Sequence, residues 1–444
     1  MDISMKAHGM KSIGRAAVIF TMIMIVSMTS RPAYAEDSPL LKSLVQEALS
    51  QNPALSAMRM GVESAFLREP QAAALPDPML MLGFTNEGFD RYTVGDMPMS
   101  RYEVGVSQMF PYPGKLGLKG ELSKTETQRR MHALDAARLK TEARVKSLYY
   151  DIRRIDKSRK LTALKLQYLS LLEDTVMALY STGRRDVADV LMVQTDRYMA
   201  MERAEMLAGE FKVMEADLLM AVGRSQNPGA PEDSSALEAR LNAEPEPSPT
   251  PFNYAAGNSE PLKTLALSAS YELMAARKTV ESAGVMVRMQ EIEAYPDFTV
   301  SVSYEPRFSD KLPDVGSIRV SFPIPVFYGS KQKQAILESK SDAARMQKEY
   351  DDMALKVVQE LSANLARINA SDRIMALYRA GLAAQARLSM ETSIAAYKSG
   401  SMPVEAIIKS INALIDYEDK YAESLTLREK AIADIYAATG GKLQ

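Results

Sequence analysis

The sequence predicts a mainly helical protein with a small β part, built from long helical hairpins and four short strands. The first observation is a run of 62 residues, 121–182, that lacks glycine and proline and is rich in helix-forming side chains. At 1.5 Å per residue it makes a helix of roughly 90 Å, longer than an ordinary domain is wide. The second is a set of short runs in which apolar and polar residues alternate, as in half-buried strands. The third is that the whole order of elements occurs twice.

The first copy of this pattern spans residues 36–222. Prolines and turn-forming residues separate its segments. The long helix begins after a proline corner, 110–115, and ends at Gly183, where a helix C-terminus favours glycine. Heptad-like apolar spacing in patches along it indicates coiled-coil packing. In chain order we predict a helix at 39–67 interrupted at Asn52-Pro53, strands at 78–85 and 101–108, the long helix, and a helix at 187–222.

Residues 223–259 are rich in Pro, Ser, Glu and Asn, which predicts an irregular linker. The pattern then starts again over residues 260–444. Two Val-Ser pairs lie 214 residues apart and two Tyr-x-x-Gly motifs 217 apart, so the chain contains an internal duplication. In this second copy we predict a helix at 262–294, strands at 297–304 and 318–322, a long helix to 399 broken only at Gly381, and a helix at 404–438.

Composition narrows the class of protein. The formal net charge is −2 over 444 residues, so bulk electrostatics give no reason to expect a nucleic-acid partner. The sequence has no cysteine, which excludes disulfides, thiolate metal sites and an acylated cysteine. His8 and His132 are its two histidines, and no catalytic or metal-ligand grouping is visible. We therefore expect no enzyme activity, no cofactor and no metal site.

Residues 1–35 have the pattern of a secretory signal peptide. A basic start precedes an apolar run, 16–28, that is too short to span a membrane as a helix. Ala33 and Ala35 then provide the small residues of a cleavage site. The alternative is a buried N-terminal helix. We expect an exported protein whose mature chain starts near residue 36.

The faces of the predicted strands indicate the environment of the sheet. Valines at 104, 106, 300 and 302 share one face, and Glu103, Ser301 and Ser303 lie on the other. Apolar residues outside and polar residues inside are typical of a membrane barrel. Four strands cannot close such a barrel, which needs about eight, and lipid tolerates no open edge, so several chains would have to contribute. The alternative is a small soluble sheet between helices.

This combination resembles the outer-membrane efflux protein family, the TolC-like channels, over essentially the whole mature chain. The matching features are the duplication, Val106-Ser107 before a proline corner, two Tyr-x-x-Gly tips and Asp189-Val190-Leu191 after Gly183. The corner at 111–115 looks most like the heavy-metal branch, the CzcC- and CusC-like members. The resemblance implies a homotrimer with a 12-strand barrel in the outer membrane of a Gram-negative bacterium and a helical tunnel through the periplasm. It further implies a periplasmic adaptor (membrane fusion) protein and an inner-membrane RND-type pump as partners.

The two tips supply the candidate site residues. Asp189 and Glu405, with Asp186 as a further candidate, would form rings of three carboxylates in a trimer, and we expect these rings to make the periplasmic gate. Glu405 stands one position earlier than the family's usual aspartate, so whether it reaches the tunnel axis stays open. Helix capping is the alternative role for the two aspartates. For adaptor docking the tip candidates are Gly183, Arg184, Arg185, Gly400, Ser401 and Met402, although the two arginines are equally compatible with solvated loop charges.

The leading functional hypothesis is a passive exit duct of a tripartite efflux system for small solutes or heavy-metal cations. A duct for type I protein secretion and a periplasmic coiled-coil adaptor are the alternatives. An adaptor should carry one helical hairpin flanked by compact β domains, whereas this chain has two hairpin tips and four strands. The 29 methionines suit soft cations, but they are scattered and equally suit irregular helix packing, so we assign them no metal.

Overall fold

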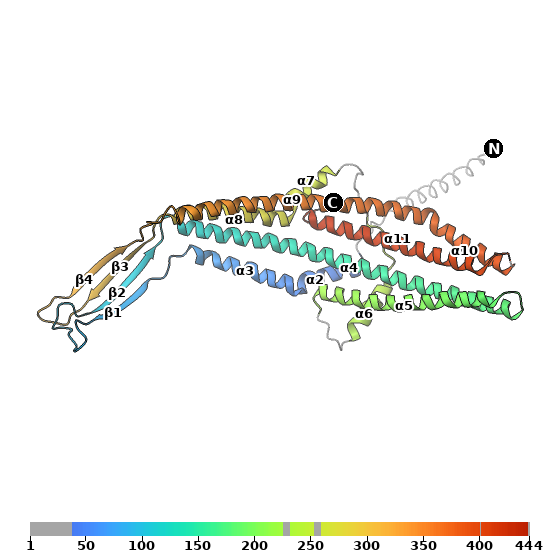
Figure 1. The fold of residues 1–444 in the computed structure, drawn as a ribbon, viewed down its shortest axis with the longest axis horizontal. Helices are drawn as coiled ribbons and strands as arrows, with labels where there is room; N and C mark the ends of the chain where they lie inside the picture. The colour runs from blue at the N-terminus through green and yellow to red at the C-terminus, as the bar shows by residue number, and fades with distance from the viewer. Residues whose placement is uncertain (1–37, 225–230, 253–258, 400, 443–444) are drawn as a thin grey trace, which may run out of the picture.

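The structure, a computed structural model, describes residues 38–224, 231–252, 259–399 and 401–442. The predicted signal peptide lies outside the described residues. The molecule is long and slender, with the strands at one end and the two helix–helix turns at the other (Figure 1). This arrangement confirms the predicted class, mainly helical with a small antiparallel sheet.

The first half of the chain folds close to its predicted bounds. Asn52 separates the first two helices, because its side chain accepts a hydrogen bond from the Ala54 N–H (2.9 Å) and Pro53 has no N–H to continue the ladder. The long helix starts at Lys115, six residues before the predicted run. The elements are α2 (Pro39–Gln51), α3 (Pro53–Ala73), β1 (Met79–Thr85), β2 (Arg101–Phe110), α4 (Lys115–Ser181) and α5 (Val187–Val222).

The second half repeats this order. At Gly381 the second long helix passes through one π-helical segment, η1, so the predicted break is a local widening of the helix and not an end. The remaining elements are α6 (Pro231–Ala243), α7 (Glu260–Ala269), α8 (Tyr271–Glu293), β3 (Phe298–Glu305), β4 (Val315–Ser321), α9 (Gln332–Leu377), η1 (Tyr378–Leu382), α10 (Ala383–Lys398) and α11 (Val404–Ala438).

The prediction of an irregular linker is wrong over Pro231–Ala243, where the chain forms the helix α6. Leu237 and Leu241 are four residues apart, so one helix face carries both, and both are buried in the first hydrophobic cluster. Hydrogen bonds also hold the end of α6 and the residues after it against α4: the Arg153 side chain donates to the carbonyls of Leu241 and Pro245, each at 2.5 Å. The abundance of proline and serine hid this short amphipathic helix.

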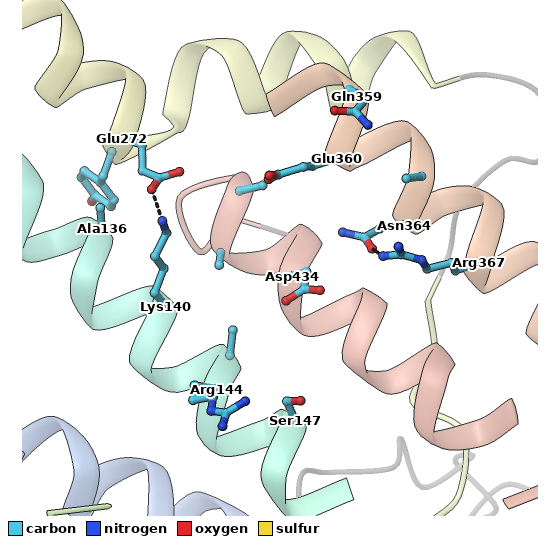
Figure 2. A pocket seen from close by; sticks show the side chains of 15 residues that line it. Ala136, Lys140, Arg144, Ser147, Glu272, Gln359, Glu360, Asn364, Arg367 and Asp434 are labelled. Atoms are coloured by element: carbon cyan, nitrogen blue, oxygen red, sulfur yellow. Dashed lines mark hydrogen bonds and ion pairs between the residues drawn. The ribbon is translucent and has the colours of Figure 1, made fainter. Parts of the chain in front are cut away.

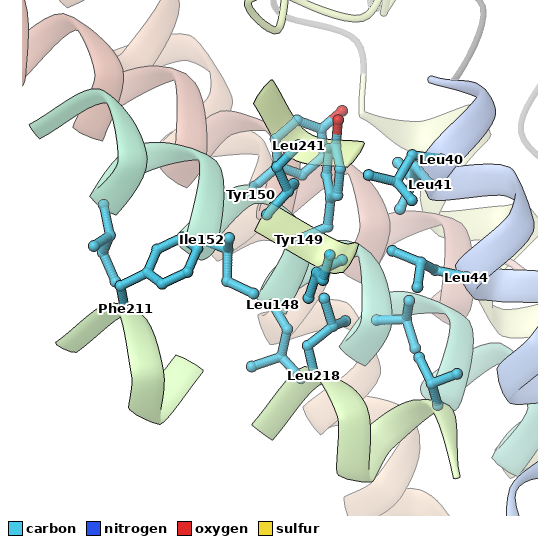
Figure 3. Close-up of a cluster of buried hydrophobic side chains, with 14 of the residues drawn as sticks. Leu40, Leu41, Leu44, Leu148, Tyr149, Tyr150, Ile152, Phe211, Leu218 and Leu241 are labelled. Atoms are coloured by element: carbon cyan, nitrogen blue, oxygen red, sulfur yellow. The ribbon is translucent and has the colours of Figure 1, made fainter. Parts of the chain in front are cut away.

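The helices form one elongated layer in which α4 is the central member. Towards the sheet the order is α3, α4, α8, α9, and towards the turns it is α5, α4, α11, α10. The helices α8 and α11 therefore occupy the same place in the layer, one after the other. A first cluster of buried apolar side chains joins α2, α4, α5 and α6, with Leu44, Leu148 and Leu218 among its members (Figure 3). A second cluster joins the two hairpins near the turns.

The sheet has the order β1-β2-β3-β4, with each neighbouring pair antiparallel. Its central register pairs Val106 with Val302 and Ser107 with Ser301. Directly opposed residues share a face, so valine stands beside valine and serine beside serine. The strands β1 and β4 form the two edges. Among the residues that the structure describes, no helix combines the length and the hydropathy that a membrane-spanning helix requires.

Candidate functional site

Side chains on the apolar face of the sheet are exposed, whereas several on the polar face are buried. Val106 and Val302 are 51% and 53% exposed, whereas Ser303 and Glu305 on the other face are buried. Arg101 pairs with the Glu305 carboxylate at 2.7 Å, and Ser317 donates to the same group at 3.0 Å. The predicted alternation of the strands is confirmed. A sheet with this polarity is the reverse of one that packs on a soluble core.

Aromatic side chains gather at both ends of the sheet. At the end far from the helices, Phe84 lies against Tyr102 with 5.2 Å between ring centroids, and Tyr102 lies against Phe308 at 5.8 Å. At the end near the helices, the rings of Phe110 and Phe298 stack at 5.4 Å. Two aromatic belts flanking an apolar band match the girdles of membrane barrels at the two lipid–water interfaces.

The turn between α4 and α5 forms the first tip. Gly183 has φ +68°, a left-handed conformation that glycine adopts without strain. The Arg184 N–H donates to the Leu179 carbonyl at 2.9 Å, which closes the helix end, and the Arg184 side chain is exposed. At the second tip, Ser401 Oγ donates to the Ala396 carbonyl at 3.0 Å. Gly400 lies outside the described residues.

The two tips are joined through Tyr397, a residue outside the predicted site residues. Its hydroxyl donates to the Asp189 carboxylate at 3.3 Å, and the Arg185 guanidinium lies 4.4 Å from its ring centroid. Arg185 also donates to the Met402 carbonyl at 3.0 Å. We call Arg185, Asp189, Tyr397 and Met402 the tip cluster. Tyr397 is the tyrosine of the second Tyr-x-x-Gly motif, so the motif itself marked its position.

Burial of Tyr397 dominates the electrostatics of the tip cluster. Its side chain is 1% exposed, and burial, reinforced by the charge of Asp189 and opposed by that of Arg185, raises the pKa of Tyr397 to about 12. The phenol therefore stays protonated at physiological pH and remains a hydrogen-bond donor to Asp189. The cluster fastens the α4–α5 hairpin to the α10–α11 hairpin.

The other predicted gate residues lie apart from the tip cluster. Asp186 is the N-cap residue of α5, but its exposed side chain makes no capping hydrogen bond. Glu405 is exposed in the first turn of α11, and Lys409, one turn later, is also exposed. The structure therefore brings Arg185, Asp189 and Met402 together and leaves Asp186 and Glu405 outside.

A cavity of about 610 Å³ lies midway along the molecule, between α4, α8, α9 and α11 (Figure 2). Lys140 forms an ion pair with Glu272 on one wall, and Arg367 donates to Asn364 Oδ1 at 2.8 Å on another. Burial raises the pKa of the Asp434 carboxyl in this cavity, against the charges of Arg367 and Lys430. Charges of both signs are spread around the wall. Within the described ranges, no three His, Cys, Asp or Glu side chains group as metal ligands would.

Comparison with known proteins places the fold. No family model matches the sequence, and no curated protein matches it. Among solved structures, the chain is similar to the outer-membrane channel OprN, with TM-score 0.76 and 15% identity over 92% of this chain and 91% of that chain. It is similar to VceC from Vibrio cholerae, with TM-score 0.71 and 17% identity over 91% and 97%.

The similarity to CusC is of the same order, with TM-score 0.74 and 15% identity over 90% of this chain and 92% of that chain. By TM-score and identity taken together, the chain is therefore not distinctly more similar to CusC than to OprN or VceC. The chain has the fold of these outer-membrane channels, long helical hairpins with a four-stranded sheet at one end.

Proposed function

We propose that this protein belongs to the TolC-like outer-membrane efflux proteins and is the exit duct of a tripartite system in a Gram-negative outer membrane. The observation that carries the proposal is the polarity of the sheet. Side chains such as Leu82 and Val302 are exposed on one face, while Glu305 and Ser107 are buried on the other. Aromatic belts at both ends complete the pattern. Lipid around a polar lumen accounts for both faces.

The open edges of the sheet require further copies of the chain. In lipid an unpaired strand edge is too costly, so β4 of one copy would pair with β1 of the next. Three copies would give a 12-strand barrel. The number three comes from the resemblance to the TolC-like channels, which implies a homotrimer. A row of exposed apolar side chains at seven-residue spacing on α5 supports lateral association, since such a row fits a coiled-coil partner. Its members are Met192, Met199, Met206, Val213 and Met220.

The first test is assembly. Purified in detergent, the mature protein should be a trimer whose strands resist protease, because paired strands in a closed barrel expose no edge. Light scattering after size-exclusion chromatography measures the mass, and limited proteolysis measures the protection. A monomeric product that is soluble without detergent would exclude the barrel.

The tips would form the periplasmic gate and the surface that an adaptor and an inner-membrane pump engage. In a trimer, Asp189 and Glu405 each become a ring of three carboxylates, and such rings favour cations. The hydrogen bond from Tyr397 to Asp189 and the contacts of Arg185 would hold the two hairpins together in the resting state. We propose small solutes or heavy-metal cations as cargo, carried passively and without enzyme activity.

The second test is the gate. In planar bilayers, Asp189→Ala combined with Glu405→Ala should lose cation selectivity and block by divalent ions, because the carboxylate rings are removed. The stability of the trimer should change little, since neither side chain is buried. Tyr397→Phe, which keeps the ring under Arg185 and loses the hydroxyl, should raise the resting conductance and preserve selectivity. Unchanged conductance in both variants, with tip helices weakened by about 1 kcal/mol, would limit Asp189 to stabilising the first turn of α5.

A further inference from the structure

The outward apolar face of β4 continues past the last residue of the strand. Along β4 itself, Ile318 and Val320 are 78% and 57% exposed. Beyond Ser321 the alternation continues with Phe322 and Ile324, which are 58% and 73% exposed, and Val326, in the turn that follows, is 77% exposed. Residues two apart in an extended chain share a face. The apolar stripe therefore extends beyond the paired part of the strand.

Several backbone N–H groups of the segment that leads into α9 are either absent or already paired. Pro323 and Pro325 have no N–H. The N–H of Val326 donates to the Ile324 carbonyl at 2.9 Å, that of Tyr328 to the Pro325 carbonyl at 3.2 Å, and that of Lys331 to the Phe327 carbonyl at 2.9 Å. Each absent or paired N–H lowers the cost of contact with lipid.

The equivalent corner of the first repeat is built differently. There Tyr112 stacks on Tyr295 with 4.8 Å between ring centroids, and Lys115 is buried beside Asp297 at 2.8 Å. The second corner has exposed Phe327 and Tyr328 in place of stacked rings, followed by two exposed lysines, Lys331 and Lys333. An apolar surface next to exposed amines suits the boundary between acyl chains and phosphate headgroups.

We propose that residues 322–333, which we call the apolar corner, insert into the phospholipid headgroup boundary on the periplasmic side of the outer membrane. Lys331 and Lys333 would pair with headgroup phosphates while Phe322, Ile324 and Val326 lie among the upper acyl chains. This inference rests on the proposed function, which places the sheet in the membrane. Pairing of the β4 edge with another strand uses backbone groups, so it leaves these outward side chains free for lipid. The corner anchors a chain whose sequence has no cysteine to acylate.

The sequence contains no tryptophan, so one introduced indole reports on a single position. The test uses the full protein reconstituted in vesicles whose phospholipids carry bromine either high or low on the acyl chain. Ile324→Trp should be quenched, and more strongly by bromine placed near the headgroup. Val302→Trp, on the apolar face of the sheet, should be quenched by the deeper bromine. Leu171→Trp, exposed on α4 and distant from the sheet, is the control that lipid should not quench.

The outcomes separate the two proposals. If Val302→Trp is quenched and Ile324→Trp is not, a second copy of the chain covers the corner and the anchor is overturned, while the duct survives. If neither is quenched, the membrane placement itself fails. In phosphatidylglycerol vesicles, Lys331→Glu with Lys333→Glu should largely abolish the quenching of Ile324→Trp, because anionic headgroups then repel the corner. Unchanged quenching in that variant would overturn the role of the lysines.

Discussion

Replacing Val302 with arginine should destabilise the membrane-inserted protein by about 2–4 kcal/mol, the cost of a cationic side chain on the lipid face near the bilayer midplane. Val302 lies between Val106 and Ile318 on the apolar face, so no anionic side chain stands directly opposite it. Urea unfolding of the protein reconstituted in vesicles, followed by tyrosine fluorescence, measures the loss.

The matched control is Ser303→Arg, one residue further on the opposite face. There Glu305, which already pairs with Arg101 and accepts from Ser303 Oγ at 3.3 Å, gives a new guanidinium an anionic partner. We expect a much smaller loss than at Val302. Similar losses at the two positions would contradict the assignment of one face to lipid and the other to the lumen.

The strands illustrate what the sequence could and could not predict. Period-two alternation located β2, β3 and β4, because valine and serine each gain from a different environment on a sheet, whereas β1 was located by the prolines before it. The ends were less certain: β4 starts at Val315, three residues before the predicted strand, since Gly316 interrupts the apolar pattern. The helix α6 was missed entirely, because its two buried leucines form too short a pattern to outweigh the surrounding prolines.

Lys115→Met should cost about 2–3 kcal/mol, because it removes charge-assisted hydrogen bonds from a buried amine. Lys115 Nζ lies 2.8 Å from Asp297 and 3.2 Å from Glu293, and it donates to the Tyr295 carbonyl at 3.0 Å. These contacts fasten the start of α4 to the junction of α8 and β3. Both carboxylates are partly exposed and regain water in the variant, which keeps the loss below that of a fully buried pair.

The pH dependence of this loss identifies its source. Burial acts to raise the pKa of Asp297, but hydrogen bonds from Lys115 and from the Tyr112 N–H outweigh it and hold the pKa below its ordinary value. The stabilisation is therefore complete at neutral pH and is lost as pH falls below about 4, through the lowered pKa. The difference between the parent and Lys115→Met should shrink there. Lys124→Met, exposed on the same helix, should show neither effect.

The tip shows why a site is harder to predict than a fold. The glycine at position 183 and the tyrosine of each Tyr-x-x-Gly motif were visible as helix-end signals, which depend on neighbouring residues only. The bond between Tyr397 and Asp189 joins residues 208 positions apart. It depends on how two hairpins pack, and no local spacing encodes that. Glu405, one position earlier than the family's usual aspartate, has an exposed side chain.

The long helices of the two hairpins differ in continuity, and η1 marks the difference. The helix α4 runs without interruption from Lys115 to Ser181 and acts as a strut from the sheet to the first tip. The corresponding long helix of the second hairpin, α9 to α10, contains the π-helical segment Tyr378–Leu382, in which hydrogen bonds join residues five apart in place of four. A Cβ added to Gly381 in this segment would have no neighbour within 4 Å. A force applied at the tips should therefore act differently on the two hairpins. We expect the first hairpin to transmit this load to the sheet and the second to bend at η1.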